Sequence, residues 1–337
     1  MDDGRIHLVY GSDDNYAYPT MVSAASAAKC LGDGRRLTVH LFDAGVSNAH
    51  WMEFRDRVCS FGKDVVCERH VLRPDMFAGF GDWKGSVVTY SRMFVAELLP
   101  DLDWALYYDG DTLWTGDIGK LWELRDEAKL ILASIDPPAP LPGEDEELTW
   151  YRRHGLDLDM RGYLCMGLML ANLRLMRDRG VPEKCRQFMK RYPCPRVVDQ
   201  TVLNYVCQGG VAALPPEWGV FSAWHGTADL TKDGAIHYVS DVPWRRDKPN
   251  RLLSDVVMLW MDFCRVALGR DVLREQTSAF GRIWRRLLFA FLKHNQWVLK
   301  IHPFVKSRFR NTHGLSVKER NAISNRLLRD KYADTKS

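Results

Sequence analysis

Short apolar runs alternate with helical patterns along the first 135 residues, and this alternation constrains the fold more than any other feature. The runs predict five strands, at residues 6–10, 36–42, 64–70, 104–108 and 130–135. Helical periodicity lies between them, at residues 18–30, 47–60 and 89–98. Strands that alternate with helices pair in parallel through crossover connections. We therefore expect an α/β fold with a Rossmann-like, mostly parallel sheet flanked by helices.

The length and the cysteines define the broad class of the protein. A chain of 337 residues suffices for one large α/β domain with an appendage. Its eight cysteines include no Cys-x-x-Cys pair and no Cys/His cluster with zinc spacing, so we interpret them as reduced thiols. Neither a secretory h-region before the first strand nor an apolar run of spanning length is visible. These features favour a cytoplasmic location.

Charge is unevenly distributed between an acidic body and a basic tail. Between Arg274 and Lys336 there are 15 Lys and Arg residues against 4 Asp and Glu residues, within a chain of net charge +4. We predict a catalytic or binding domain at 1–255 and a basic helical region at 256–337. Apolar and basic residues alternate from Trp284 to Lys300, which is typical of a helix that contacts an anionic membrane surface on the inner face of the membrane. A packed helix and a partner-binding helix remain alternatives, and nucleic acid is not expected.

The tripeptide Asp109-Gly110-Asp111 directly follows the predicted strand at 104–108. Open α/β sheets bind their ligands at the carboxyl ends of strands. Two carboxylates one residue apart repel each other unless a cation or hydrogen-bond donors stabilise both charges. A divalent metal that holds a diphosphate fits this pattern, and an ordinary Asp-Gly turn is the alternative.

The first strand is followed by Gly11-Ser12-Asp13-Asp14-Asn15-Tyr16 rather than by a dinucleotide-binding or P-loop motif. Carboxylate and amide groups at a strand end can pair with the edge of a base, and the ring of Tyr16 can stack on its face. The same residues would also suit the start of a helix, because Asp and Asn are good N-caps.

Four segments together resemble glycosyltransferase family 8, the retaining enzymes of GT-A fold that include bacterial lipopolysaccharide galactosyl- and glucosyltransferases. The segments are 9–16, 89–92, 107–111 and 237–244. The resemblance extends over residues 6–247 and implies a GT-A fold. It further implies transfer of a hexose from a UDP-sugar to a glycan or glycolipid hydroxyl with retention of configuration, as in lipopolysaccharide or surface polysaccharide synthesis.

The resemblance also assigns roles to residues around the nucleotide. Asp13 and Asn15 would bind uracil, Tyr16 would stack on it, and the backbone at Gly11 would lie close to the base. Asp109 and Asp111, with Gly110 between them, would join His237 in holding Mn²⁺ or Mg²⁺ against the two phosphates. Oxygen ligands with one imidazole suit such a metal.

On the sugar side, the resemblance implies that Arg92 lies near the donor sugar and that Asp136 binds sugar hydroxyls. Asp199 and Gln200 match an Asp-Gln-Asp segment, in which Thr201 replaces the last Asp. Gln200 is a poor nucleophile because its amide is neutral. We therefore favour front-face attack, in which the leaving phosphate accepts the proton of the acceptor and Asp199 and Gln200 position the sugar.

The chain departs from the family pattern in the segment His237–Trp244, which is one residue shorter and lacks the phosphate-binding lysine. Arg245 is our candidate to replace it, with Arg246 and Lys248 nearby. Cys165-Met166-Gly167 stands where the family carries Asn-x-Gly. A UDP-sugar-binding protein with lost or weak transfer therefore remains an alternative. A nucleotidyltransferase would need a second phosphate-binding element, and no Gly- or Lys-rich segment of that kind is present.

Overall fold

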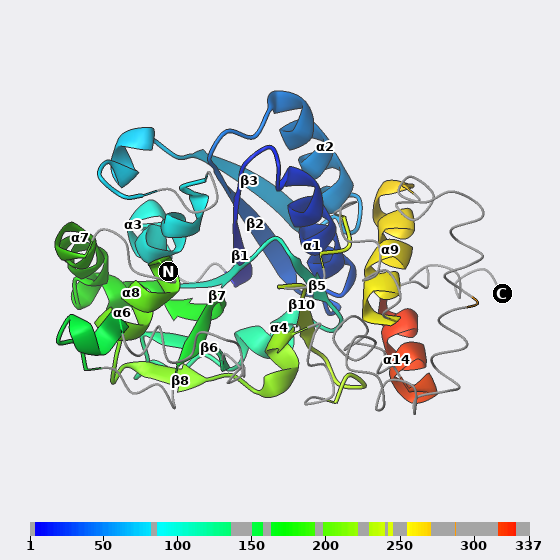
Figure 1. The fold of residues 1–337 in the computed structure, drawn as a ribbon. Coiled ribbons are helices and arrows are strands. Elements are labelled where there is room, and N and C mark those ends of the chain that lie inside the picture. The colour runs from blue at the N-terminus through cyan, green and yellow to red at the C-terminus, as the bar shows by residue number, and fades with distance from the viewer. Residues whose placement is uncertain are drawn as a thin grey trace.

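The computed structural model describes residues 4–81, 86–135, 150–157, 163–192, 198–221, 229–239, 242–244, 255–270, 287 and 316–327. Its centre is a seven-stranded sheet of order β3-β2-β1-β4-β7-β6-β8 (Figure 1). The strands are β1 (Arg5–Ser12), β2 (Arg36–Asp43), β3 (Val65–Val71), β4 (Trp104–Tyr108), β6 (Ile131–Ile135), β7 (Leu164–Asn172) and β8 (Val211–Ala213).

The sheet is mostly parallel, as the sequence predicts. Parallel pairs join β3, β2, β1 and β4, and β6 pairs in parallel with β8. All five predicted strands form, each within a few residues of its expected bounds. The sequence analysis assigned no strand to β7, which runs antiparallel between β4 and β6. It is buried along its whole length, so it lacks the period-two pattern that reveals half-buried strands.

Helices cover both faces of this sheet. On one face lie α1 (Ala17–Lys29) and α2 (Asn48–Cys59), packed on Leu8, Leu37 and Val39. The chain can bury α1 on all sides because most of its residues are small or apolar. A second core cluster on the other face includes Val9 and Phe42. The helices that contribute to this second cluster are α6 (Leu173–Asp178), α7 (Val181–Arg191) and α8 (Val198–Val206), shown in green in Figure 1.

The helix expected at residues 89–98 is mostly a 3₁₀ helix, which corrects the sequence interpretation. This stretch forms η2 (Val88–Phe94) and then α3 (Val95–Leu98), and a separate 3₁₀ turn, η1 (Pro74–Phe77), precedes it in the chain. Val88, Thr89 and Tyr90 are β-branched or aromatic residues with weak helix propensity. In a 3₁₀ helix, side chains three residues apart are aligned, so Thr89 and Arg92 point in the same direction.

A small second sheet, of order β5-β10-β9, lies beside the carboxyl end of β4. It contains β5 (Thr112–Trp114), β9 (Val220–Phe221) and β10 (Ala235–His237), connected through α4 (Ile118–Trp122) and η4 (Pro216–Gly219). Beyond α1 lie α9 (Asp255–Leu268) and α14 (Val317–Leu327), coloured yellow and red in Figure 1. Both contribute buried side chains to the core cluster of α1. None of the helices in the described ranges is long and apolar enough to cross a membrane.

Candidate active site

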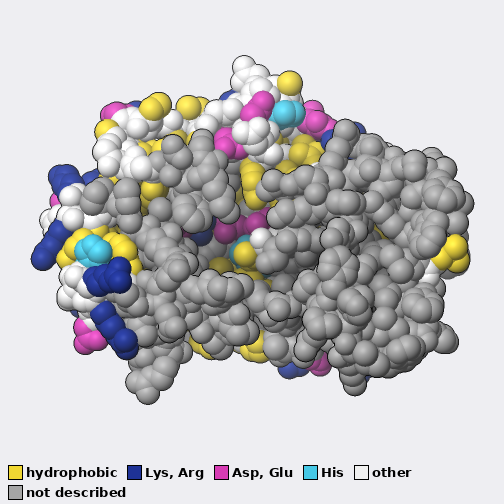
Figure 2. Space-filling model, viewed as in Figure 1, with side chains coloured by type: hydrophobic (Ala, Val, Ile, Leu, Met, Phe, Trp, Pro, Cys, Tyr) yellow, Lys and Arg dark blue, Asp and Glu magenta, His cyan; other side chains and the backbone are white. Residues whose placement is uncertain are grey.

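A cavity of about 480 Å³ lies at the carboxyl ends of β1 and β4. Figure 2 shows acidic side chains, with basic and histidine side chains beside them, in a hollow near the centre of this face. Nearly all of the residues singled out from the sequence line this cavity, namely Gly11, Asp13, Asn15, Tyr16, Arg92, Asp109, Gly110, Asp111, Asp199, Gln200 and His237. Asp136, Arg245, Arg246 and Lys248 lie outside the described residues.

The small sheet brings His237 to the two carboxylates. After β4 the chain turns at 109–111 and enters β5, and antiparallel pairing sets His237 opposite Thr112. A backbone hydrogen bond from Tyr238 N to Asp111 O, 2.8 Å long, fixes the same register. As a result, His237 Nε2 lies 3.0 Å from Asp111 Oδ1 and 3.9 Å from Asp109 Oδ2. Asp111 and His237 are 126 residues apart in sequence, and only the fold joins them.

This donor set fits a hard divalent metal. One ligand atom from each of Asp109, Asp111 and His237 lies within 4.8 Å of the others. Neighbouring ligands of an octahedral ion with bonds of about 2.0–2.1 Å are about 3 Å apart, which is close to the spacing of His237 Nε2 and Asp111 Oδ1. Carboxylate oxygens with one imidazole suit Mn²⁺ or Mg²⁺ better than a soft metal.

Burial and mutual charge interactions shift the pKa values of all three side chains. Burial raises the pKa of Asp109 to about 6, with the Asp111 carboxylate adding to the rise and the Arg92 guanidinium opposing it. Burial also acts to raise the pKa of Asp111, but His237 outweighs it and the pKa falls below its usual value. Burial lowers the pKa of His237, yet the Asp111 carboxylate holds it well above the usual value. A bound cation in this place would stabilise the charged forms of both carboxylates.

Arg92 connects two carboxylates at the wall of the cavity. Its Nη2 donates to Asp109 Oδ1 at 2.5 Å, and its Nε lies 3.0 Å from Asp199 Oδ2. The guanidinium also lies over the ring of Tyr107, 5.1 Å from the centroid. From the same face of η2, Thr89 Oγ1 donates to Asp199 Oδ1 at 2.7 Å. Both oxygens of Asp199 therefore have a partner, and Asp109 keeps Oδ2 directed at His237.

Two glycines make room for this arrangement. A Cβ on Gly110 would meet the Thr20 side chain of α1 and would lie 3.1 Å from the Thr20 backbone. A Cβ on Gly167 would meet Asp109 Oδ2 and would lie 3.3 Å from Arg92 Nη1. Since Asp109 N also donates to Gly167 O at 2.8 Å, β7 presses directly against the carboxylate turn. Sequence analysis noted Gly167 only as a motif position and missed this role.

The loop after β1 also lines the cavity and presents a partly exposed aromatic ring. Tyr16 is 38% exposed and contacts Trp244 edge-to-face, with 5.9 Å between ring centroids. Asp13 Oδ1 accepts from Tyr16 N at 3.1 Å, which holds the start of α1 against the loop. Asp13 and Asn15 lie beside this ring on the cavity wall. An aromatic face next to a carboxylate and an amide can hold a planar heterocycle.

Gln200 is positioned by α8, which is locked to β7 by a residue that the sequence did not single out. The Asn204 side chain accepts from Leu164 N at 2.9 Å and donates to Leu164 O and Gln200 O at 2.8 and 2.9 Å. One turn away, Gln200 Oε1 accepts from Met166 N at 3.3 Å. Nearby, Cys165 is buried and lines the cavity. A buried Asn on a short helix has no local sequence signal that distinguishes it from a solvated one.

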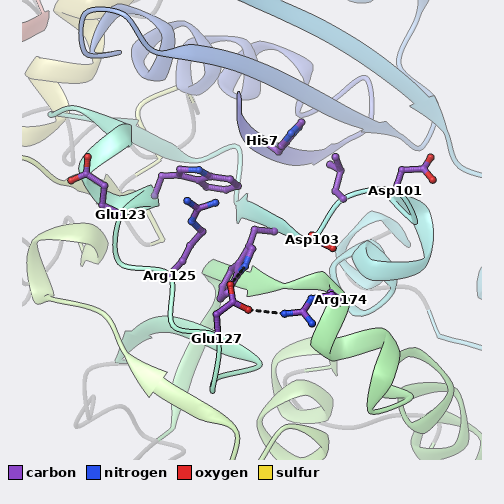
Figure 3. A pocket seen from close by; sticks show the side chains of 10 residues that line it. His7, Asp101, Asp103, Glu123, Arg125, Glu127 and Arg174 are labelled. Atoms are coloured by element: carbon purple, nitrogen blue, oxygen red, sulfur yellow. Dashed lines mark hydrogen bonds and ion pairs between the residues drawn. The ribbon is translucent and has the colours of Figure 1, made fainter. Parts of the chain in front are cut away.

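A second cavity, of about 430 Å³, lies at the amino ends of β1 and β4 (Figure 3). Within it Glu127 accepts from Arg174 at 2.8 Å and from Trp104 Nε1 at 3.2 Å. Arg125 lies over the Trp122 ring, 4.6 Å from the centroid. Asp109, Asp111 and His237 line the first cavity and not this one. We therefore take the cavity at the carboxyl ends as the candidate site.

Comparisons with known proteins identify the family of the chain. The family model described as "Glycosyl transferase family 8" matches residues 7–248. General stress protein A of Bacillus subtilis is 24% identical over 224 residues, which are 64% of this chain and 74% of that protein. A Haemophilus influenzae protein with only a provisional glycosyltransferase name is 23% identical over 211 residues, 61% of this chain and 60% of its own.

Solved structures share the fold. The galactosyltransferase LgtC, in complex with donor and acceptor sugar analogues, superposes with a TM-score of 0.60 at 24% identity, covering 72% of this chain and 90% of that one. The bifunctional glycosyltransferase WbbM gives a TM-score of 0.61 at 19% identity over 73% of this chain. The chain spans 48% of the WbbM chain and 60% of the Haemophilus protein, less than two thirds of each.

Proposed function

The chain belongs to glycosyl transferase family 8, and from this premise we propose that it transfers a hexose from a UDP-sugar to a hydroxyl group of a glycan or glycolipid, with retention of configuration. One observation carries the proposal: Asp109, Asp111 and His237 converge in the cavity that also contains Tyr16, Arg92 and Gln200. A nucleotide diphosphate-sugar needs a place for its base, its phosphates and its sugar, and this cavity offers a suitable group for each.

For the nucleotide part of the donor, the chemistry of the side chains suggests which residues bind the base and which bind the diphosphate. Tyr16 offers its ring face to uracil, with Asp13 and Asn15 beside it to pair with the base edge. Asp109, Asp111 and His237 would hold Mn²⁺ or Mg²⁺, which would neutralise charge that develops on the departing diphosphate. Arg245 remains our proposed replacement for the missing phosphate-binding lysine. We expect UDP affinity to fall in Arg245→Ala. An unchanged affinity would contradict this role of Arg245.

At the sugar, the contacts of Asp199 favour a positioning role. Thr89 and Arg92 each bind one of its carboxylate oxygens, which lowers the nucleophilicity of both. Gln200 carries a neutral amide held at Met166 N. We therefore propose front-face attack: the acceptor hydroxyl oxygen bonds to the anomeric carbon as the bond to the UDP oxygen breaks. The hydroxyl proton passes to the departing phosphate oxygen. Asp136 remains proposed as a ligand of sugar hydroxyls.

The test is hydrolysis of a panel of UDP-hexoses with Mn²⁺ or Mg²⁺ and with EDTA, because transfer to water needs no knowledge of the acceptor. We expect UDP release from one sugar, lost with EDTA and in Asp111→Ala, and retained in Asp126→Ala, an exposed turn residue whose carboxylate accepts from Ala128 N. UDP binding without turnover of any sugar would instead support a UDP-sugar-binding protein. If the protein neither binds UDP nor turns over any UDP-hexose, the proposed transferase activity is rejected.

A lipid-linked acceptor in lipopolysaccharide or surface polysaccharide synthesis is the finer part of the proposal, and it rests on the family resemblance and the basic tail. The amphipathic segment 284–300 lies outside the described residues apart from Leu287, which is 64% exposed. We propose that this segment holds the protein at an anionic membrane surface. Flotation with anionic but not neutral liposomes is expected, and equal behaviour with both would contradict it.

A further inference from the structure

Two histidines and a glutamate meet on neighbouring strands at the edge of the large sheet, away from the candidate active site. His40 lies on β2, and Glu68 and His70 lie on the edge strand β3. In the parallel register His40 pairs with Glu68, so these three side chains share the face opposite α1 and α2. Each can offer one ligand atom within 4.8 Å of the others.

The three candidate ligand atoms are His40 Nδ1, Glu68 Oε2 and His70 Nε2. His40 Nδ1 lies 3.0 Å from His70 Nε2 and 3.3 Å from Glu68 Oε2, and His70 Nε2 lies 3.7 Å from Glu68 Oε2. Tetrahedral zinc, with bonds of about 2.0–2.2 Å, sets its ligands about 3.3–3.6 Å apart. The three distances, 3.0, 3.3 and 3.7 Å, therefore lie around the ligand spacing expected along the edges of one face of a zinc tetrahedron.

The surroundings suit a metal ion as well as the spacing does. His40 is buried, whereas the side chains of Glu68 and His70 are 54% and 29% exposed, which leaves the fourth position towards solvent. Among the described residues, the only ion-pair partners of Glu68 are His40 and His70. The neighbouring Arg69 is engaged elsewhere, since it binds Asp43 at 2.7 Å.

A third histidine, on β1, lies next to His40 on the side away from β3. His7 Nδ1, on β1, lies 3.0 Å from His40 Nε2, and His7 lines the cavity of Figure 3. When His40 donates from Nε2 to His7, its Nδ1 presents a lone pair towards Glu68 and His70. A second partner that fixes the tautomer in this way accompanies most histidine ligands of metals.

We propose that His40, Glu68 and His70 bind Zn²⁺, with water as the fourth ligand and His7 as the positioning residue. Two imidazoles with one carboxylate are an established ligand set for this ion. The ion would tie the edge strand β3 to β2, because its ligands come from both. Sequence spacing hides the site, since only Glu68-x-His70 is local and His40 comes from the preceding strand.

The experiment measures Zn²⁺ binding by calorimetry and Co²⁺ binding by visible absorption. It compares the full chain of unchanged sequence with the Asp111→Ala variant, in which the candidate metal site of the first cavity is disabled. We expect one Zn²⁺ and a tetrahedral Co²⁺ spectrum in that variant. His70→Gln and Glu68→Gln should each abolish both signals. His7→Gln should weaken Zn²⁺ binding by roughly 10–100-fold without abolishing it.

His50→Gln is the matched control, because His50 is also a partly exposed histidine beside a carboxylate, 2.7 Å from Asp14. It should leave Zn²⁺ binding unchanged. In the full chain, His70→Gln should remove one equivalent of Zn²⁺ and the rise in unfolding temperature that Zn²⁺ produces. Absence of Zn²⁺ binding in the Asp111→Ala protein, or equal binding in His70→Gln, would show that the histidines form only a hydrogen-bonded ladder.

Discussion

At the scale of single residues, the site depends on side chains that the packing holds rigidly, and Gly167 tests this. Gly167→Ala introduces a Cβ that meets Asp109 Oδ2 and Arg92 Nη1. We expect the Asp109 carboxylate to turn away, and Mn²⁺-dependent UDP affinity to fall at least about tenfold, which is about 1.4 kcal/mol. Calorimetry measures this. Gly62→Ala, whose Cβ would meet only a Val65 methyl group at 3.3 Å, should bind UDP normally. Equal affinity in the two variants would contradict the steric argument.

Arg92 gives a second prediction at this scale, because it lies between the partly buried carboxylate of Asp109 and the buried carboxylate of Asp199. Arg92→Met leaves Asp109 and Asp199 without their shared cation. Removing one member of a buried ion network costs about 3–5 kcal/mol of folding free energy. Urea unfolding compares this variant with Arg186→Met, which removes a more exposed arginine that binds Glu97 and lies over Phe94. We expect a loss of about 1 kcal/mol or less there. A small loss in both would mean that the carboxylates take up protons without cost.

At the scale of elements, Asn204 holds α8 against β7, and its removal should affect stability and activity together. Asn204→Ala leaves Leu164 N and O without their side-chain partner. An unsatisfied buried polar group costs about 1–3 kcal/mol, and the shift of α8 should misplace Gln200. We expect both the free energy of unfolding and kcat/KM to fall. The value of kcat/KM is measured with the donor sugar that the hydrolysis panel identifies.

Asn172→Ala separates the two effects. Asn172 is also buried and caps α6 by accepting from Leu175 N at 2.9 Å, far along β7 from the cavity. Loss of such a cap costs about 0.5–2 kcal/mol. This variant should lose stability and retain kcat/KM. An equal loss of kcat/KM in both variants would assign the effect to general destabilisation.

The elements also show how far sequence reasoning reaches. Strands β1, β2 and β4 were predictable because each is a short, mostly apolar run bounded by polar turns, and Asp109 and Asp111 follow directly from the end of β4. The resemblance, not the local pattern, linked His237 to them, since a three-residue strand like β10 carries almost no signal. The roles of Asn204 and Gly167 depend on contacts between β7 and distant segments. No property of either residue alone predicts those contacts.

At the scale of the whole molecule, the described part of the tail packs as an extension of the body, which bears on the predicted boundary at residue 255. Arg326 on α14 donates to Lys232 O at 2.7 Å and to Thr231 O at 3.0 Å, in the segment that leads into β10 and His237. Asp233 lies 3.4 Å from the same arginine and accepts from Asp117 N at 2.9 Å. The helix thus braces the loop before β10, the strand that carries His237.

This packing predicts that the body and α14 unfold together. Ile323 on α14 is fully buried in the core cluster that includes α1 and α9. Ile323→Ala should therefore lower the free energy of unfolding by about 2–4 kcal/mol, because it removes buried methyl groups and leaves a cavity. Ile135→Ala, at an isoleucine that is 51% exposed, should cost much less. Thermal unfolding followed by calorimetry should show one transition that moves down in Ile323→Ala. If 256–337 is a separate domain, a second transition should move alone while the first, and UDP binding with it, stays in place.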